Sequence, residues 1–141
     1  MANQKYDNLT VMMTTGPFNW VGNPINAYLM TGATFDTTDI LLSDTGGQVL
    51  LYVPVPGRAV GPTGALLGLP VSFNRVPKDE EFQVILAKDE GATNSPHVIA
   101  FYDEDANGDP LLLQNNGTLI VRPELVEDPE APPQLGVWVS I

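Results

Sequence analysis

The stretch that decides the fold spans residues 97–122 and reads HVIAFYDEDANGDPLLLQNNGTLIVR. Asn107-Gly108 and Asn116-Gly117 supply the positive φ angles that two-residue hairpin turns require, because Gly lacks a Cβ and Asn tolerates the left-handed region. The segments around these turns are rich in Val, Ile, Phe, Tyr, Leu and Thr, which pack well on a pleated surface. The stretch therefore predicts three short antiparallel strands in a β-meander.

Further strands are expected on both sides of this stretch. They cover residues 9–15, 25–31, 48–55, 71–76, 82–87 and 136–141. Pro54 places the strand over residues 48–55 at a sheet edge or strand end, because proline has no N–H to donate to a neighbouring strand. Together with the meander this gives about eight or nine short antiparallel strands, a pattern typical of an all-β protein with a β-sandwich or barrel-like fold.

Helical structure is expected only as one short turn within residues 35–47. Asp36 or Thr37 is expected to cap its start, and Gly46-Gly47 is expected to end it. The chain contains 13 Gly and 13 Pro, and proline breaks helix interiors because it lacks the N–H and clashes with the preceding turn. We therefore predict no long helix.

A length of 141 residues suits one domain, and we predict a single β domain over residues 1–141. Residues 1–8 are polar and predict a flexible N-terminal arm. Residues 123–134 combine prolines with carboxylates and predict an extended acidic connector. Residues 56–70 are the least regular part, and their apolar side chains are expected either to be covered by a partner or to fold back onto the core.

The charge balance excludes two classes of partner. The chain has 6 Lys and Arg against 17 Asp and Glu, a formal net charge of -11, and its basic residues form no cluster. Nucleic acid and anionic membrane are recognised through grouped cations, so neither is expected as a partner. The first residues lack the apolar segment of a secretion signal, and no apolar run approaches the ~20 residues that cross a bilayer.

One motif has the residue types of an ion site. Its oxygen-bearing side chains are Asp103, Asp105, Asn107 and Asp109. With Gly108 they match the first half of a calcium loop, in which oxygens at alternate positions converge on a hard cation. The second half does not match, because Gln114 stands where a bidentate Glu is needed. The preferred interpretation is a hairpin turn with solvated acids; a calcium site is the weaker alternative, and no cofactor is expected.

No group of residues has the pattern of a catalytic centre. His97 is the only histidine, and we interpret it as a half-exposed polar residue at the start of a strand, with a pH switch as the less favoured alternative. Adjacent carboxylates in loops lack the contrasting environments that acid–base catalysis needs. Trp20 and Trp138 are expected to fill the core; an interface or a sugar-stacking platform is the alternative. We therefore predict no enzymatic activity and no catalytic residues.

Several blocks of the sequence together form a pattern that recurs in other proteins. They are Trp20, INAYLMTGATFD at 25–36, LSD at 42–44, VIAFYDE at 98–104, Pro110-Leu111, GTLIV at 117–121 and GVW at 136–138. In these blocks the chain resembles small bacteriophage structural proteins. The resemblance implies a virion component, but it carries no functional residues over because the shared blocks are structural.

The leading hypothesis from this resemblance is a capsid decoration, or cement, protein. Its partners would be the major capsid protein lattice or other virion proteins, its state a homo-oligomer, and its location the virion, assembled in the host bacterial cytoplasm. Arms and loops that lie across a shell gain avidity from many weak contacts. The alternative within the same virion is a tail, collar or head-fibre adaptor. A second alternative is a calcium- or sugar-binding β module, based on residues 103–109 and the tryptophans.

Overall fold

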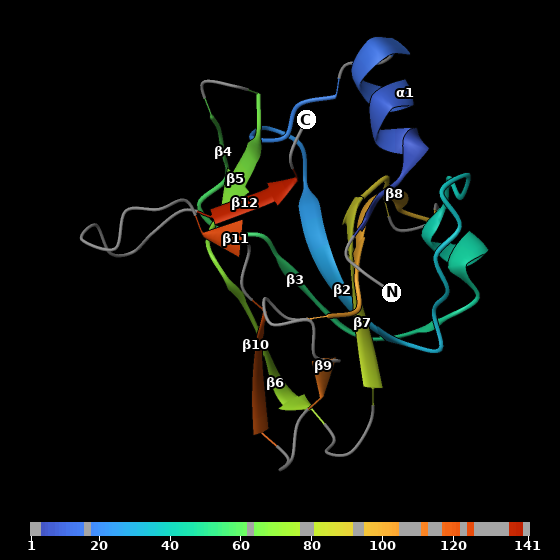
Figure 1. The fold of residues 1–141 in the computed structure, drawn as a ribbon, viewed down its shortest axis with the longest axis vertical. Coiled ribbons are helices and arrows are strands. Elements are labelled where there is room, and N and C mark those ends of the chain that lie inside the picture. The colour runs from blue at the N-terminus through green and yellow to red at the C-terminus, as the bar shows by residue number, and fades with distance from the viewer. Residues whose placement is uncertain are drawn as a thin grey trace.

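A computed structural model describes residues 4–15, 18–61, 64–76, 81–91, 95–104, 111–112, 117–121, 124–125 and 136–139 (Figure 1). Within these residues most of the chain is in antiparallel strands, and the fold is all-β and sandwich-like, as predicted. The two helical elements are the helix α1 (Asp7–Thr15) and the short 3-10 helix η1 (Leu42–Thr45).

The strands fall into a longer and a very short group. The longer strands are β2 (Ile25–Thr31), β3 (Gln48–Pro54), β5 (Leu66–Gly68), β6 (Val71–Val76), β7 (Glu81–Lys88), β8 (His97–Tyr102), β10 (Gly117–Val121) and β12 (Gly136–Val139). The two-residue strands are β1 (Gln4–Lys5), β4 (Ala59–Val60), β9 (Leu111–Leu112) and β11 (Glu124–Leu125).

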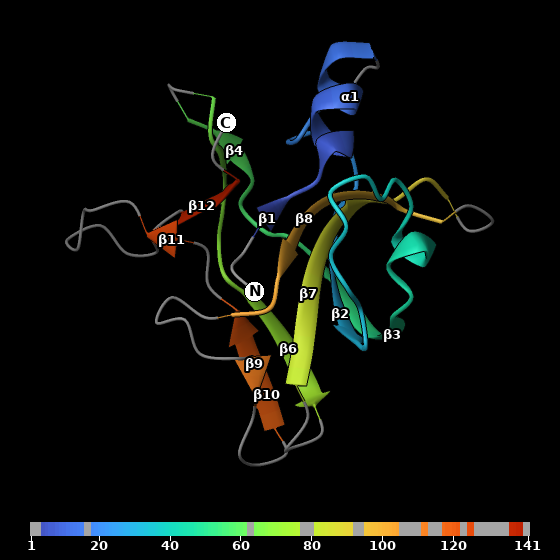
Figure 2. The ribbon, with the colours of Figure 1, turned by 45° about the vertical axis from the view of Figure 1, so that its right-hand side comes forward.

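Three sheets are formed within the described residues. The main sheet has the order β1-β8-β7-β2-β3, with β9 paired to the first residues of β7. A two-stranded sheet pairs β10 with β6, and a four-stranded sheet has the order β11-β12-β5-β4. Figure 2 shows β7 as a long curved strand in the middle of the molecule, with β6 and β10 towards its lower end. The two smaller sheets contribute side chains to one shared core on the same face of the main sheet.

The interior strand β2, between β7 and β3, explains why the main sheet carries two cores. Its side chains alternate between the two faces of the sheet, as in any strand. Ile25, Ala27 and Leu29 lie in the larger core, while Tyr28 and Met30 lie in the smaller one. A strand buried on both faces has apolar residues at successive positions instead of alternating ones, as residues 27–30 do.

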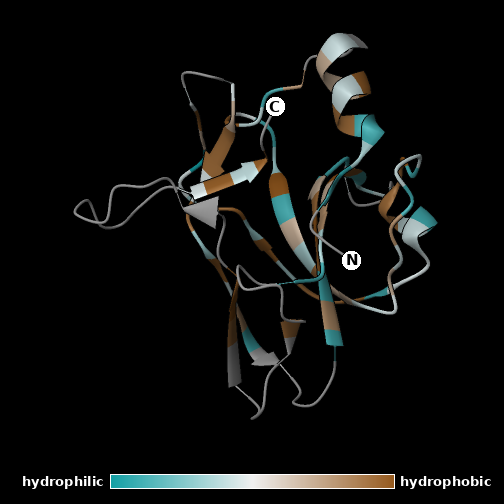
Figure 3. Cartoon of the chain, in the orientation of Figure 1, coloured by the Kyte–Doolittle hydropathy of each residue, from teal (hydrophilic) through white to brown (hydrophobic). Residues whose placement is uncertain are grey.

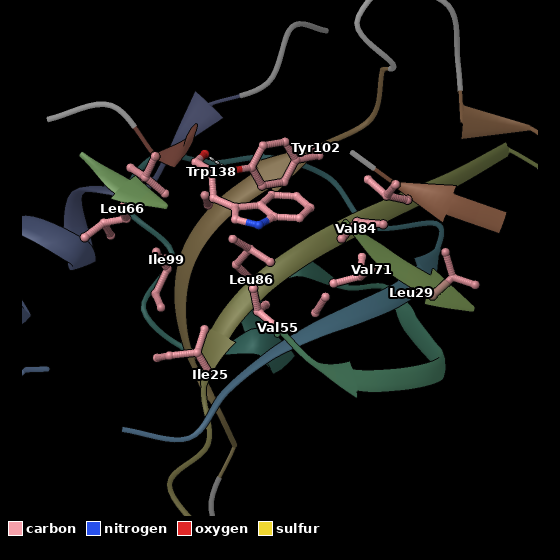
Figure 4. Packing of buried hydrophobic residues seen from close by; sticks show 14 of the residues in the cluster. Ile25, Leu29, Val55, Leu66, Val71, Val84, Leu86, Ile99, Tyr102 and Trp138 are labelled. Carbon is pink, nitrogen blue, oxygen red and sulfur yellow. Dashed lines mark hydrogen bonds between the residues drawn. The ribbon is translucent and has the colours of Figure 1, made fainter. Parts of the chain in front are cut away.

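The larger core is closed by the C-terminal strand β12. Trp138 lies among aliphatic side chains of the main sheet and next to the ring of Tyr102 (Figure 4). Burial of each large apolar side chain contributes about 1.5–3 kcal/mol. Gly68 on β5 makes room for this tryptophan, because a Cβ there would lie 2.8 Å from the indole nitrogen of Trp138.

The smaller core lies beneath residues 33–45 on the opposite face of the main sheet. Tyr6, Phe35 and Phe101 form a row of tilted rings, with centroids 4.9 Å and 5.5 Å apart along the row. The predicted helical turn is present as η1, and Gly46 ends it in the left-handed conformation with φ 75°. Its predicted cap by Asp36 or Thr37 is wrong, since η1 begins at Leu42.

The N-terminal predictions need correction. Residues 9–15 were expected to form a strand but form most of α1, and the part of the predicted flexible arm that is described, residues 4–8, is packed onto β8. Tyr6 and Leu9 are fully buried. The Asn8 amide donates to the Val98 carbonyl at 3.2 Å, so tertiary contacts order this segment and override its weak local propensity.

The three strands of the predicted meander lie where they were expected, and the bond between Asp103 and Leu111 joins the end of β8 to β9, but the other pairings that the described residues show are with strands outside the meander. Within the described residues β8 pairs with β7 and β1, β9 pairs with β7, and β10 pairs with β6. The two Asn-Gly turns contain residues outside the described part of the chain. Of the predicted acidic connector, residues 124–125 form β11, and the remainder lies outside the described residues.

Candidate interaction surface

The predicted calcium motif lies mostly beyond what the structure describes. Asp103 follows β8, and its carbonyl accepts a hydrogen bond from the Leu111 N–H at 3.3 Å, which brings β9 next to the end of β8. Asp105, Asn107 and Asp109 lie outside the described residues. Among the residues that are described, no group of three or more His, Cys, Asp or Glu side chains could hold a metal ion. The calcium site therefore stays a prediction.

His97 is half-exposed at the start of β8, as predicted, with 36% of its side chain accessible. Its Nδ1 lies 3.5 Å from a carboxylate oxygen of Glu90, and the same oxygen is 3.2 Å from the Lys88 ammonium. Lys88 and His97 are also register partners across β7 and β8. An ion pair near the surface, such as that of Lys88 with Glu90, contributes about 0–1 kcal/mol, so this group adds little to the stability of the strand pair.

Both tryptophans fill the core, as predicted. Trp20 and Trp138 are almost fully buried. The Trp20 indole donates to the Leu67 carbonyl at 2.9 Å, and the Trp138 indole donates to the Leu69 carbonyl at 3.3 Å. Each indole N–H is therefore satisfied by the backbone around β5, as a buried donor must be. These side chains stabilise the sandwich and are not placed to stack on a ligand.

The irregular stretch over residues 56–70 contains the β4–β5 hairpin. Leu66 is buried, in agreement with the expectation that apolar side chains here fold back, whereas Val60 is more than half exposed. Arg58 fixes the base of the hairpin, because its guanidinium donates to four backbone carbonyls at 2.8–3.2 Å. Burial lowers the pKa of Arg58. This anchor was not predicted, because a lone arginine carries no signal of its distant partners.

The described residues expose most of one strand, β3, at the end of the main sheet. Its side chains Val49, Leu51 and Tyr52 are 40%, 38% and 62% exposed, and these three residues are called the open strip below. Figure 3 shows hydrophobic residues along β3 at this end of the sheet. The edge position was predicted from Pro54, and the structure confirms it. The exposure of the apolar side chains was not predicted.

Both faces of β3 contribute to the open strip. Tyr52 stacks on Tyr28 of the neighbouring strand, with ring centroids 5.6 Å apart and planes at 30°. Burial raises the pKa of Tyr28, whose hydroxyl accepts a hydrogen bond from the Asn26 amide at 3.3 Å. Tyr28 therefore gives Tyr52 a rigid base, so the outer ring is held in place while most of its surface is open to solvent.

The backbone of β3 is only partly open to pairing. The Val55 N–H donates to the Ile25 carbonyl at 3.0 Å. In an antiparallel ladder the backbone groups of successive residues alternate between facing the neighbouring strand and facing away from it. The backbone groups of Val53 and Leu51 therefore face β2, and those of Tyr52 face outward. A bulge interrupts the register between Leu51 and Val49. Bulges and edge prolines both protect a strand from uncontrolled addition of another strand, so contacts at this edge depend mainly on side chains.

Exposed carboxylates lie in the segment that precedes β3. Asp36 accepts hydrogen bonds from the Thr38 backbone and hydroxyl, and these bonds lower its pKa. Burial and the neighbouring Asp36 raise the pKa of Asp39. Asp44 accepts from the Leu41 N–H at 2.9 Å. The segment thus carries negative charge, whereas β3 itself has no charged side chain.

No protein-family model, no curated protein and no solved structure matches this chain. Neither helix in the described ranges is long and apolar enough to cross a membrane. The fold and its surface therefore define the class: an all-β, sandwich-like protein that presents a rigid, uncharged apolar strip at one end of its main sheet. Such a surface can contact another protein, because a partner that covers these side chains removes their apolar area from water.

Proposed function

We propose that the chain is a non-enzymatic structural protein of a bacteriophage virion, and that it decorates the capsid by binding the lattice of the major capsid protein. The observation that carries the proposal is the open strip on β3, three exposed apolar side chains held on a sheet that is buried on both faces next to it. A subunit with this design presents a fixed surface to a neighbour. The resemblance to small phage structural proteins supplies the identity of that neighbour.

The charge of the chain supports a role in which attachment is repeated many times. A formal charge of -11 keeps free subunits apart in solution. Where the lattice surface is basic, it also speeds attachment more than it tightens each single contact. Weak contacts made by many copies on one shell add up through avidity. A strip of three apolar side chains is suited to such a weak, repeated contact.

The test compares phage particles with and without this protein. Particles from which the gene has been deleted are expected to lose infectivity faster on heating and on osmotic shock than parental particles. Adding the purified protein back to the deleted particles is expected to restore the resistance. If deleted particles resist heat and osmotic shock as well as parental ones, the decoration role is wrong.

Copy number separates decoration from the adaptor alternative. Gel densitometry of purified particles is expected to give copies on the scale of the capsid lattice, because every lattice position offers a site. A tail, collar or fibre adaptor is limited to the copy number of a ring. Both tryptophans on which the sugar-binding alternative rested are buried, so they do not support it.

A further inference from the structure

We infer that Met12 is an oxidation site that controls the docking of α1. When hydrogen peroxide converts its thioether to a sulfoxide, the second half of the helix, residues 10–15, separates from the larger core while the sheets stay folded. The inference is independent of the proposed function, because it concerns the folded chain alone. It names a modification site that neither the fold nor the resemblance assigns.

The helix α1 is attached to the rest of the molecule along one narrow face. It lies at the periphery of the molecule in both views (Figures 1 and 2) and packs on β8. Leu9 is buried in the larger core, and Met12, one helical turn further on, packs against the same core. Of the described side chains that follow Leu9 in α1, only that of Met12 is not exposed. The second half of the helix is therefore held by one methionine.

This half of α1 has little stability of its own. The helix has nine residues, and isolated helices shorter than about 12–15 residues are marginal in water. Val11 is β-branched, which lowers helix propensity. The Thr14 hydroxyl donates to the Thr10 carbonyl at 2.9 Å, a contact that slightly destabilises helices. The helical conformation of residues 10–15 therefore depends on the contact that Met12 makes with the core.

The residues before this half have separate anchors. The Tyr6 N–H donates to the Ile99 carbonyl at 3.0 Å, and the Asn8 amide donates to the Val98 carbonyl at 3.2 Å. Leu9 is also fully buried. These contacts do not involve Met12, so its modification is expected to free residues 10–15 and to leave residues 4–9 on β8.

The three methionines in the described part of the chain differ in how open they are to an oxidant. Met13 is 43% exposed, Met12 is partly buried, and Met30 is only 1% exposed in the smaller core. The rate at which a methionine is oxidised follows its exposure. Met13 is therefore expected to react first and Met12 second, whereas Met30 is protected. Because Met13 makes no core contact, its oxidation has no consequence for the docking of α1.

The chemistry at Met12 changes an apolar contact into a polar one. The thioether sulfur attacks one oxygen of hydrogen peroxide, an S–O bond forms as the O–O bond breaks, and the other oxygen takes up the proton and leaves as water. The sulfur is oxidised by two electrons and the peroxide is reduced. The product is a polar sulfoxide that faces aliphatic and aromatic side chains. A polar group without a hydrogen-bond partner is costly to bury, so the sulfoxide favours water over the core.

Peptide mass spectrometry of the purified chain after treatment with hydrogen peroxide tests the order of oxidation. Met12 is expected to react at least about threefold more slowly than Met13, and Met30 is expected to stay reduced while the chain is folded. Hydrogen exchange then measures the docking of the helix. Once Met12 is oxidised, the amides of residues 11–15 are expected to lose protection at least about tenfold, whereas those of β7 and β8 keep theirs. The melting temperature is expected to fall by about 2–6 °C.

Two neighbouring substitutions form a matched pair. Leucine has no sulfur and a volume close to that of methionine, so Met12→Leu and Met13→Leu are both expected to fold. After the same peroxide treatment, Met12→Leu is expected to keep the protection of residues 11–15, and Met13→Leu is expected to lose it as the wild type does. Met1 and Met30 are present in all three chains, so their oxidation cannot explain the difference.

Three results would overturn the inference. In the first, Met12 stays reduced in the folded wild-type chain. In the second, Met12 is oxidised but residues 11–15 keep their protection, or β7 and β8 lose theirs to the same extent. In the third, peroxide removes the protection of residues 11–15 in Met12→Leu as fully as in the wild type.

Discussion

Tyr102 and Trp138 join two sheets through one side-chain pair. Their rings meet edge to face, with centroids 5.5 Å apart and planes at 81°, and the Tyr102 hydroxyl donates a hydrogen bond to the Trp138 carbonyl. The first residue ends β8 in the main sheet and the second lies in β12 of the four-stranded sheet. This pair therefore ties the C-terminal strand across the larger core.

Replacing Tyr102 by Phe separates the two parts of this contact. The variant keeps the ring and loses the hydroxyl, so the carbonyl of Trp138 loses that donor in a buried site. We expect the free energy of unfolding to fall by about 1–3 kcal/mol, measured by urea denaturation. An unchanged free energy of unfolding would show that this hydrogen bond contributes nothing to stability.

The same substitution at Tyr6 is expected to have the opposite sign. The Tyr6 hydroxyl is buried and, among the described residues, has no hydrogen-bond partner. Tyr6→Phe removes a polar group that the fold leaves unsatisfied, while its ring contact with Phe35 remains. We expect the variant to be as stable as the wild type or up to about 1 kcal/mol more stable. A loss of stability comparable to that of Tyr102→Phe would mean that the hydroxyl has a partner.

Replacing Asp39 by Asn is expected to raise the stability of the fold in a pH-dependent way. Burial, followed by repulsion from Asp36, raises the pKa of the Asp39 carboxyl in the folded state. The folded chain therefore binds more protons than the unfolded chain between the unfolded value of about 3.9 and the raised folded value, so this group lowers stability as pH rises through that window. Asp39→Asn should be more stable than the wild type at pH 7, by less than about 1 kcal/mol at this partly exposed site.

The gain from Asp39→Asn should shrink as pH falls through the raised folded value and be nearly gone at about pH 3, where the Asp39 carboxyl is mostly protonated in both the folded and the unfolded chain. Asp36→Ala provides the contrasting variant. Hydrogen bonds from Thr38 lower the pKa of Asp36, so its contribution is present at neutral pH and is lost as pH falls through the lowered folded value. Melting temperatures of both variants and the wild type between pH 3 and pH 8 measure the two trends. Parallel curves for Asp39→Asn and the wild type would contradict the assignment.

Replacing Arg58 by Lys keeps the charge but is expected to lower the free energy of unfolding substantially. Its planar guanidinium reaches the carbonyls of Ile25, Val55, Val21 and Asn23 at once. A lysine ammonium is a compact point charge whose three donors lack this planar fork, so Arg58→Lys is expected to cost about 2–3 kcal/mol. Thermal and urea unfolding measure the loss. A cost no larger than that of a surface substitution, about 0.5 kcal/mol, would show that the anchor is dispensable.

The positions of most strands were predictable from the sequence, because their local signals are strong. Residues 25–31 and 71–76 form strands with the predicted bounds. Their partners were less predictable, since the pairing of β10 with β6 is fixed by a core that assembles residues far apart in the chain. Pro54 marked the edge strand, because the loss of a backbone donor is a local property.

The helix and the open strip show the limits of local patterns. Thr10, Val11 and Thr14 are β-branched and favour a strand, yet α1 forms because Leu9 and Asn8 are held against the main sheet. For residues 56–70 the sequence left open whether the apolar side chains are covered by a partner or fold back onto the core, and in the structure Leu66 is buried while Val60 is exposed. Whether an apolar side chain on β3 is covered depends on where the two smaller sheets end, and no local pattern specifies that position.

The bond from Asn8 to Val98 has a consequence for how the chain is made. The two residues are 90 positions apart, so α1 and the residues before it leave the ribosome well before the strand they pack against. At typical translation rates this gap lasts on the order of 5–20 s. Such long-range contacts slow folding. During this interval the side chains of Tyr6 and Leu9, which are buried in the folded chain, lack their native contacts. A chaperone could therefore bind the nascent protein at this segment.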